Sequence, residues 1–322
     1  MTNNIVFNFF DGDKTMLALC RHFNLDKSSV ERFLVQEMIM HGKNPNTFYV
    51  SFDLAKEFKI LLGNIDTKKV FITAKHLTTL SDEGSALKKY GLLNLKDVLE
   101  KDTPLNQFLQ VKNIKFNIDK KKIRIHETEL DLFRCTNDCK SCSIGKSNCS
   151  QFSPEYRSAI DRIYIKLYTD KSEIEVFLCG TDDEIEKYSY ITRHPEFLYN
   201  IDKLLTTMQL PAILSNEWAK LQDNQFYVVE FDLCMHFLEY IPSCIYDEKP
   251  SYELFENYLD LLGYNEDDFL SERIPNDFYY NIFLIKNSLD VFFTGKGKEY
   301  GQILPEIKIP FSDLRVIRKS IL

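Results

Sequence analysis

His76 and Thr78 are the residues of this 322-residue chain whose types and spacing most directly suggest chemistry. They stand two positions apart in an apolar run, 70–80, that is rich in β-branched residues. Side chains two apart on an extended strand point to the same face. An imidazole and a hydroxyl placed in this way can hydrogen-bond the two hydroxyls of a ribose. The alternative is a structural histidine bonded to backbone, and the pair alone does not decide between the two.

The segment after this run strengthens the ribose interpretation. Residues 83–90 are predicted to be helical and to end at Gly91, which tolerates the left-handed backbone that often closes a helix. His76-Leu77-Thr78 followed by Tyr90-Gly91-Leu92 resembles the His-x-Thr and Gly-Leu pattern of the ADP-ribosyltransferase superfamily. The likeness is greatest to its His-Tyr-Glu branch and to the DarT-like toxins that modify nucleic acids. The resemblance implies a split β-sheet core, NAD as substrate, and a contact of His76 and Thr78 with the adenosine-side ribose.

The same resemblance assigns roles to residues later in the chain. It implies a tyrosine that stacks on the nicotinamide ring, for which Tyr188 is preferred and Tyr190 is the second choice. Arg193 can meet a phosphate bidentately. Glu306, on a strand predicted over 303–309, is the implied catalytic acid. Its carboxylate would orient the nicotinamide ribose and stabilise positive charge as nicotinamide leaves. An exposed glutamate without such a role is the alternative.

Four of the eight cysteines form a separate motif, C-x3-C-x2-C-x6-C, made of Cys135, Cys139, Cys142 and Cys149. Thiolates at this spacing can close a tetrahedron around Zn(II) and give structure to a polar loop. The sequence therefore predicts a structural zinc site. An iron–sulfur cluster, disulfides and free thiols are the alternatives, and the first three cysteines also have the spacing of radical S-adenosylmethionine enzymes.

Composition sets further expectations. The formal net charge of −8 argues against a general nucleic-acid coat, since phosphates are held mainly by Lys and Arg. One segment of this acidic chain is nevertheless rich in positive charge; it contains Lys112, Lys115, Lys120, Lys121, Lys122 and Arg124. It is either a local phosphate-binding groove or the solvated face of a hairpin. The absence of a long apolar run and of a signal-peptide pattern predicts a cytoplasmic protein without a membrane span.

The predicted architecture is α+β. Residues 1–67 are expected to form an N-terminal helical segment, with Ser28 and Glu31 as a capping box and Gly42 as a helix end. Residues 68–322 are expected to form the ADP-ribosyltransferase-like domain, with a hairpin and the four-cysteine loop inserted at about 111–155. Period-two or apolar patterns predict the strands of this domain. They lie at 70–74, 114–118, 122–126, 163–167, 174–178, 225–232, 291–294 and 303–309. Helices are expected at 14–23, 93–109 with a break near Thr103-Pro104, and 197–208.

These features favour an NAD-dependent, toxin-like ADP-ribosyltransferase, of the kind used in anti-phage defence. It would transfer ADP-ribose to an RNA or DNA base, or secondarily to a protein side chain, and release nicotinamide. A bound antitoxin or chaperone is one explanation for the acidic composition. The main alternative is a zinc-stabilised module that binds nucleic acid or protein without catalysis. A radical or iron–sulfur enzyme is the third class.

Overall fold

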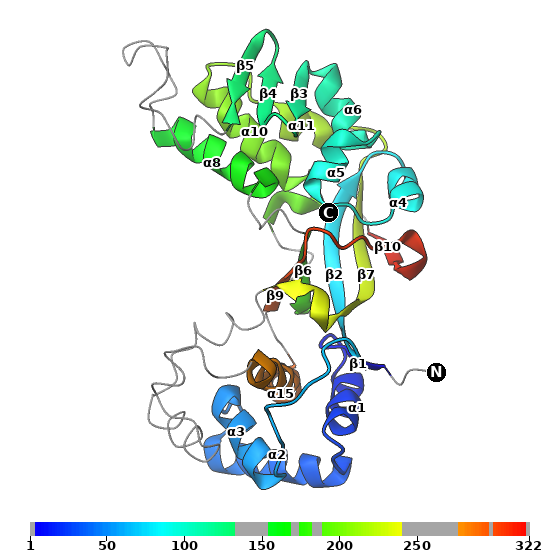
Figure 1. Ribbon diagram of the computed structural model, residues 1–322, viewed down its shortest axis with the longest axis vertical. Coiled ribbons are helices and arrows are strands. Elements are labelled where there is room, and N and C mark those ends of the chain that lie inside the picture. The colour runs from blue at the N-terminus through cyan, green and yellow to red at the C-terminus, as the bar shows by residue number, and fades with distance from the viewer. Residues whose placement is uncertain are drawn as a thin grey trace. The chain divides into compact units, whose positions relative to one another are not determined.

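The computed structural model describes residues 4–132, 154–168, 174–181, 189–239, 276–295 and 299–319 (Figure 1). The chain forms two compact units. The first consists of Met1–Ala74, Val176–Ile185 and Asp232–Gly301. The second consists of Lys75–Glu175, Glu186–Phe231 and Gln302–Leu322. Each unit is therefore assembled from segments that lie far apart in the sequence.

The first unit is built around a buried helix, α15 (Asn276–Thr294). Residues 281–289 of α15 are buried at every position, so the helix is enclosed on all sides. Helices α1 (Gly12–His22) and α3 (Thr47–Glu57) pack against it, and α2 (Lys27–His41) connects them. The N-terminal helices thus share a core with a helix more than two hundred residues away.

Helix α2 begins and ends for identifiable reasons. Asp26 caps its N-terminus, because its carboxylate accepts a 2.8 Å hydrogen bond from the Ser29 amide. The predicted capping box led by Ser28 is therefore wrong, since an acidic cap lies two residues earlier. The helix ends at Gly42, as predicted, with φ of 87°.

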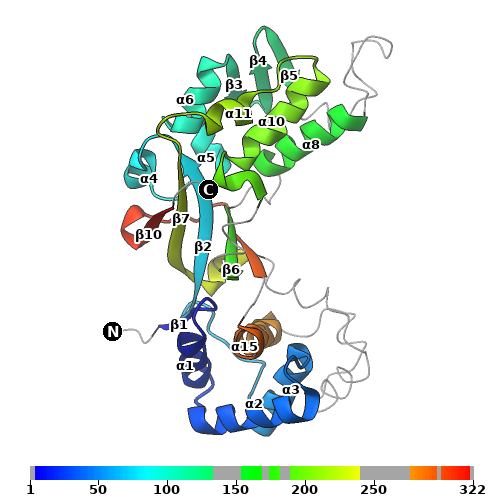
Figure 2. The ribbon, with the colours of Figure 1, turned by 180° about the vertical axis from the view of Figure 1, so that it is seen from behind.

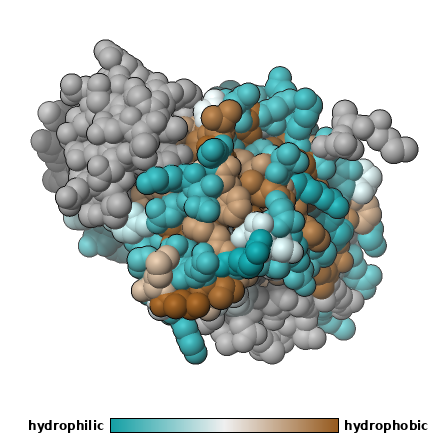
Figure 3. Space-filling model, turned by 90° about the horizontal axis from the view of Figure 1, so that it is seen from below, coloured by the Kyte–Doolittle hydropathy of each residue, from teal (hydrophilic) through white to brown (hydrophobic). Residues whose placement is uncertain are grey.

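Apolar side chains remain exposed on the first unit. Ile39 and Met40 of α2 are 78 and 64% exposed, although Val30 and Leu34 of the same helix are buried, and Leu61 after α3 is 81% exposed. Figure 3, which views the molecule from below, shows brown apolar residues among teal polar ones on the face turned toward the viewer. Helix α2 is therefore apolar on more than its core-facing side.

The second unit contains a small sheet backed by helices. Strands β3 (Ile114–Asn117), β4 (Lys122–Ile125) and β5 (Thr128–Asp131) pair antiparallel, with Ile114 opposite Ile125. The predicted hairpin is confirmed. Its buried face joins a core formed by α5 (Leu95–Glu100), α6 (Pro104–Val111), α8 (Pro154–Tyr168), α10 (Glu196–Thr207) and α11 (Leu214–Ala219). Helices α8 and α10 lie side by side in both ribbon views (Figure 2).

The larger sheet supplies the strands of the candidate site. Its order is β10 (Arg315–Lys319), β7 (Gln225–Cys234), β2 (Val70–Leu80), β6 (Ile174–Cys179), β9 (Glu299–Ile303) and β8 (Leu238–Glu239). Strand β1 (Ile5–Phe7) pairs parallel with the start of β2, and β10 pairs antiparallel with β7. The mixture of helices with largely antiparallel pairing confirms the predicted α+β class.

Several local predictions are corrected. Residues 163–167, predicted as a strand, belong to α8, because Tyr156, Ile160, Ile163 and Leu167 form a buried helical stripe. Residues 291–294 are the last turn of α15. The predicted interruption at Thr103-Pro104 is confirmed, since Thr103 caps α6 and Pro104 occupies its first turn. In the described part of the chain, no helix is long and apolar enough to cross a membrane.

Candidate functional site

Strand β2 carries His76 and Thr78 on one face. Lys75, Leu77 and Thr79 are buried, whereas His76 and Thr78 are half-buried, so exposure alternates along this part of the strand. Both candidate ribose ligands therefore point to the more accessible side. The three buried residues lie on the opposite face.

The imidazole of His76 is oriented by the neighbouring strand. Its Nδ1 lies 2.9 Å from the backbone oxygen of Glu175 in β6. A carbonyl oxygen only accepts, so Nδ1 donates, and in the neutral ring Nε2 is then an acceptor. Burial of the ring lowers the pKa of His76, against the opposing effect of the Glu175 carbonyl and carboxylate. The neutral tautomer with an accepting Nε2 is the form suited to a ribose hydroxyl, although the backbone bond is also what a structural histidine makes.

The segment after β2 turns tightly into helix α4 (Ser85–Tyr90). The Asp82 carboxylate accepts hydrogen bonds from the amides of Gly84 at 3.0 Å and Ala86 at 2.6 Å. Helix α4 ends at Gly91, whose φ is 73°, as the sequence predicted. A Cβ at Gly91 would lie 2.2 Å from the Ile309 carbonyl oxygen, so only glycine fits there.

Glu306 lies in the segment that touches this glycine. Strand β9 ends at Ile303, and Glu306 is exposed in a turn closed by a 3.0 Å bond from the Ile307 amide to the Leu304 oxygen. The predicted strand over 303–309 is therefore wrong, because Pro305 has no amide hydrogen to donate to a ladder and the chain turns there.

Two hydrogen bonds fasten this turn to the connection after α4. The Leu92 amide donates to the Ile309 oxygen at 2.9 Å, and Asn94 Nδ2 donates to the Pro305 oxygen at 3.2 Å. Glu306 lies between these two anchor points in the sequence. Asn94 has a second role, because its Oδ1 caps α5 through the Asp97 amide. Sequence reasoning missed this contact; the only local signal was an asparagine at a helix start.

The segment predicted to contact nicotinamide and phosphate, around Tyr188, Tyr190 and Arg193, is described only in part. Tyr188 lies outside the described residues. Tyr190 belongs to the short 3-10 helix η3 (Ser189–Thr192), and its side chain is also outside the description. Arg193 is exposed, and its backbone oxygen accepts a 2.7 Å bond from Asn224 Nδ2. Since Asn224 directly precedes β7, the neighbour of β2, this bond ties the Tyr190–Arg193 segment to the sheet that carries His76.

The predicted zinc ligands Cys135, Cys139, Cys142 and Cys149 lie outside the described residues, so the metal stays a prediction. Within the described part of the chain no group of His, Cys, Asp or Glu could hold a metal ion. Cys179 there is fully buried, and burial raises the pKa of its thiol to about 12. It is therefore a core residue and not a nucleophile.

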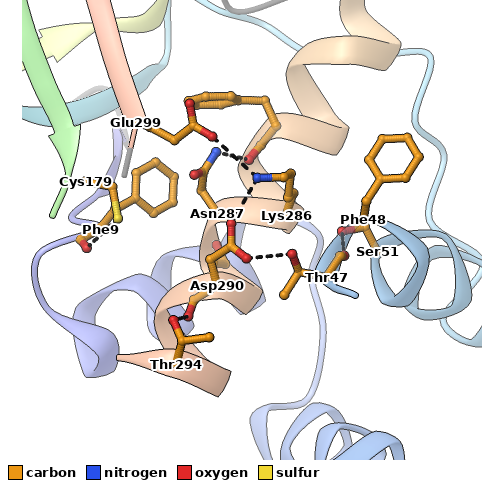
Figure 4. A network of polar contacts seen from close by, with 12 residues as sticks. Phe9, Thr47, Phe48, Ser51, Cys179, Lys286, Asn287, Asp290, Thr294 and Glu299 are labelled. Carbon is orange, nitrogen blue, oxygen red and sulfur yellow. Dashed lines mark hydrogen bonds and ion pairs between the residues drawn. The ribbon is translucent and has the colours of Figure 1, made fainter. Parts of the chain in front are cut away.

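The first unit contains a polar network that the sequence did not reveal (Figure 4). Lys286 Nζ of α15 lies 3.0 Å from Asp290 Oδ2 and 3.4 Å from Glu299 Oε1 of β9. Thr47 Oγ1 of α3 donates to Asp290 Oδ1 at 2.5 Å. Because Lys286 is paired with two carboxylates inside the core, the network joins α15 to α3 and β9 and has a structural role.

The chain was compared with family models, curated proteins and solved structures, and nothing matches it. The residues and their contacts therefore carry the functional argument. They attach a turn with an exposed glutamate to the segment that follows the histidine-bearing strand and its glycine-terminated helix.

Proposed function

We propose that this protein is an NAD-dependent ADP-ribosyltransferase that modifies nucleic acid. The observation that carries the proposal is the attachment of the Glu306 turn to the segment following the His76 strand, through Leu92–Ile309 and Asn94–Pro305. These contacts join residues more than two hundred positions apart. They support the idea that the two motifs serve one substrate.

In this proposal β2 holds the adenosine-side ribose. His76 Nε2 accepts a hydrogen bond from one ribose hydroxyl, while the hydroxyl of Thr78, on the same face, contacts the other. The bond from Nδ1 to the Glu175 oxygen fixes the ring for this task. Tyr188 or Tyr190 stacks on nicotinamide, and Arg193 meets a phosphate of the NAD diphosphate.

The chemistry is assigned to Glu306. The bond between the nicotinamide nitrogen and the ribose C1′ breaks, and its electron pair leaves with nicotinamide, which becomes neutral. The carboxylate stabilises the positive charge that develops on the ribose. A nitrogen or oxygen of the acceptor then forms the new bond to C1′, and its proton passes to the carboxylate of Glu306.

Glu306→Gln tests this assignment and has a matched control. Glu127 is also an exposed glutamate in a turn, between β4 and β5, so Glu127→Gln removes an equivalent charge away from the proposed site. Nicotinamide release from NAD is expected to fall at least about 100-fold in Glu306→Gln and to stay unchanged in Glu127→Gln. Equal rates in the two variants would remove Glu306 from the reaction.

A further inference from the structure

One face of α8 carries a row of cationic and aromatic side chains that the proposed NAD site does not use. Arg157 and Arg162 are exposed there, and Ile165 is 46% exposed, whereas the opposite face is buried against the core. A shallow, open depression of about 450 Å³ on the outer face is lined by Pro154, Arg157, Ser158, Asp161, Arg162 and Ile165.

Two tyrosines continue this face toward the end of the helix. The rings of Tyr164 and Tyr168 lie 5.4 Å apart, between centroids. Lys121, in the turn between β3 and β4, places its Nζ 5.7 and 5.6 Å from these two centroids. Lys96 of α5 places its Nζ 6.0 Å from the centroid of Tyr168. Cations from two other elements therefore converge on the tyrosine pair.

The phenolic oxygen of Tyr168 is buried and has no hydrogen-bond partner among the described residues. Burial is the main cause of the raised pKa of this phenol, so the proton stays on the oxygen at neutral pH. Because this oxygen is buried, a ligand on the outer face contacts the Tyr168 side chain through its ring and not through its hydroxyl.

Helical spacing joins these residues into one row. Arg157, Asp161, Tyr164 and Tyr168 are separated by four, three and four positions, which places them along one flank of α8. At about 1.5 Å per residue, the row is roughly 16 Å long. That length accommodates a few nucleotides of a single strand.

Acidic groups face the same row and limit its positive charge. Asp161 lies within it, and Glu100 and Asp119 act on Tyr168. The surface of α8 is thus not uniformly basic, as a surface that binds the phosphates of a duplex would be. Alternation of a few cations with aromatic rings is instead the pattern that binds single strands, where bases stack and phosphates pair with Lys or Arg. An acidic peptide would use the cations but would make no stacking contact with the two rings.

We infer that the outer flank of α8, together with Lys96 and Lys121, is the surface that binds a single-stranded nucleic acid. The bases stack on Tyr164 and Tyr168, and the phosphates contact the arginines and lysines. The inference rests on the proposed function in one respect, that the bound strand is the ADP-ribose acceptor. Its test does not require catalysis.

The test measures binding of labelled single-stranded RNA and DNA oligonucleotides to the full chain at several salt concentrations. Tyr164→Ala and Tyr168→Ala are each expected to bind about tenfold more weakly, whereas Tyr164→Phe keeps the ring and the affinity. Arg157→Gln and Arg162→Gln are each expected to reduce the salt dependence by about one phosphate contact. Arg32→Gln, at an exposed arginine of α2, is the control and leaves binding unchanged.

Three results would overturn the inference: no binding of either oligonucleotide at low salt, α8 variants that bind as tightly as Arg32→Gln, or tighter binding of polyglutamate than of nucleic acid. Cleavage of NAD without acceptor is followed in parallel. If the α8 variants lose binding and keep NAD cleavage, the surface is separated from the NAD site. If the unmodified chain cleaves no NAD but the variants still lose binding, the transferase proposal fails and the surface stands.

Discussion

At the scale of single residues, the environment of His76 decides what the candidate site can do. One ring nitrogen donates to a backbone oxygen, and burial keeps the ring neutral, so the other nitrogen is left as an acceptor. Glu306 differs, because its side chain is exposed in a turn. The position of this turn is fixed by the hydrogen bonds that the Pro305 and Ile309 oxygens accept. The histidine side chain is held by a hydrogen bond to the neighbouring strand β6, whereas the glutamate is positioned only through the backbone on either side of it.

The lowered pKa of His76 predicts a dependence of stability on pH. In the unfolded chain the imidazole takes up a proton near its ordinary pKa of about 6.5, but in the fold it does so only at lower pH. The unfolded state thus binds more protons as pH falls through 6.5, and the free energy of unfolding decreases. His76→Asn retains a donor for the Glu175 oxygen but cannot titrate, so this decrease should become smaller.

Denaturant titrations at pH 7 and pH 5 measure the effect. His22 has a pKa lowered for the same reason, burial, and supplies a comparison within the first unit. An unchanged pH dependence in His76→Asn would mean that the pKa of His76 is the same in the folded and the unfolded chain, so that the fold does not lower it.

At the scale of elements, local patterns explain some of the fold and not the rest. The β3–β4 hairpin was predictable because its buried and exposed residues alternate. The end of α4 at Gly91 was predictable because the backbone there has a positive φ, which glycine tolerates. The α8 stretch around Ile163 was misread because five residues alternate in a way that also fits a strand. The bonds from Asn94 to Pro305 and from Asn224 to Arg193 were not predictable, since they join segments through tertiary contact.

Gly91→Ala tests the contact between α4 and the Glu306 turn. The substitution adds strain at positive φ, about 1 kcal/mol, and a collision with the Ile309 oxygen. Gly42→Ala is the control, because Gly42 has φ of +87° but nothing within 4 Å of its Cβ position. Thermal unfolding should show a larger loss for Gly91→Ala, and nicotinamide release should fall in this variant alone. Equal losses of stability would mean that the turn is not held by Gly91.

Glu230 of β7 is expected to stabilise three neighbouring strands. Its carboxylate lies 2.9 Å from Arg315 Nε of β10 and 4.0 Å from Nζ of the buried Lys75 in β2. Glu230→Gln weakens the pairing of a buried ammonium group and should cost about 2 kcal/mol of unfolding free energy. Arg315→Gln removes a half-exposed partner and should cost less than about 1 kcal/mol. Similar costs for both variants would assign the effect to the surface pair alone.

At the scale of the whole molecule, the two units divide the proposed tasks. The first unit encloses α15 and its Lys286 network, and the second carries His76, Glu306 and the α8 flank. The sequence motifs led to the proposed NAD site through residue types. They did not reveal that 1–74 belongs to a unit with α15, because that assignment depends on contacts between distant segments.

The four-cysteine motif gives a prediction for the whole chain. Replacement of Cys139 and Cys142 by Ser should remove bound zinc and lower the melting temperature, because metal binding contributes directly to folding. Metal analysis of the purified protein and thermal unfolding measure both effects. A variant with unchanged metal content and melting temperature would contradict a structural zinc site, and absorbance near 400 nm would indicate an iron–sulfur cluster instead.

The most direct test of the central claim is incubation of the protein with NAD labelled in its ADP-ribose part and with separate pools of RNA, DNA and protein. We expect that label enters a nucleic-acid pool, that nicotinamide is released in equal amount, and that Glu306→Gln abolishes both. Label in no pool and no consumption of NAD by the unmodified chain would contradict this claim.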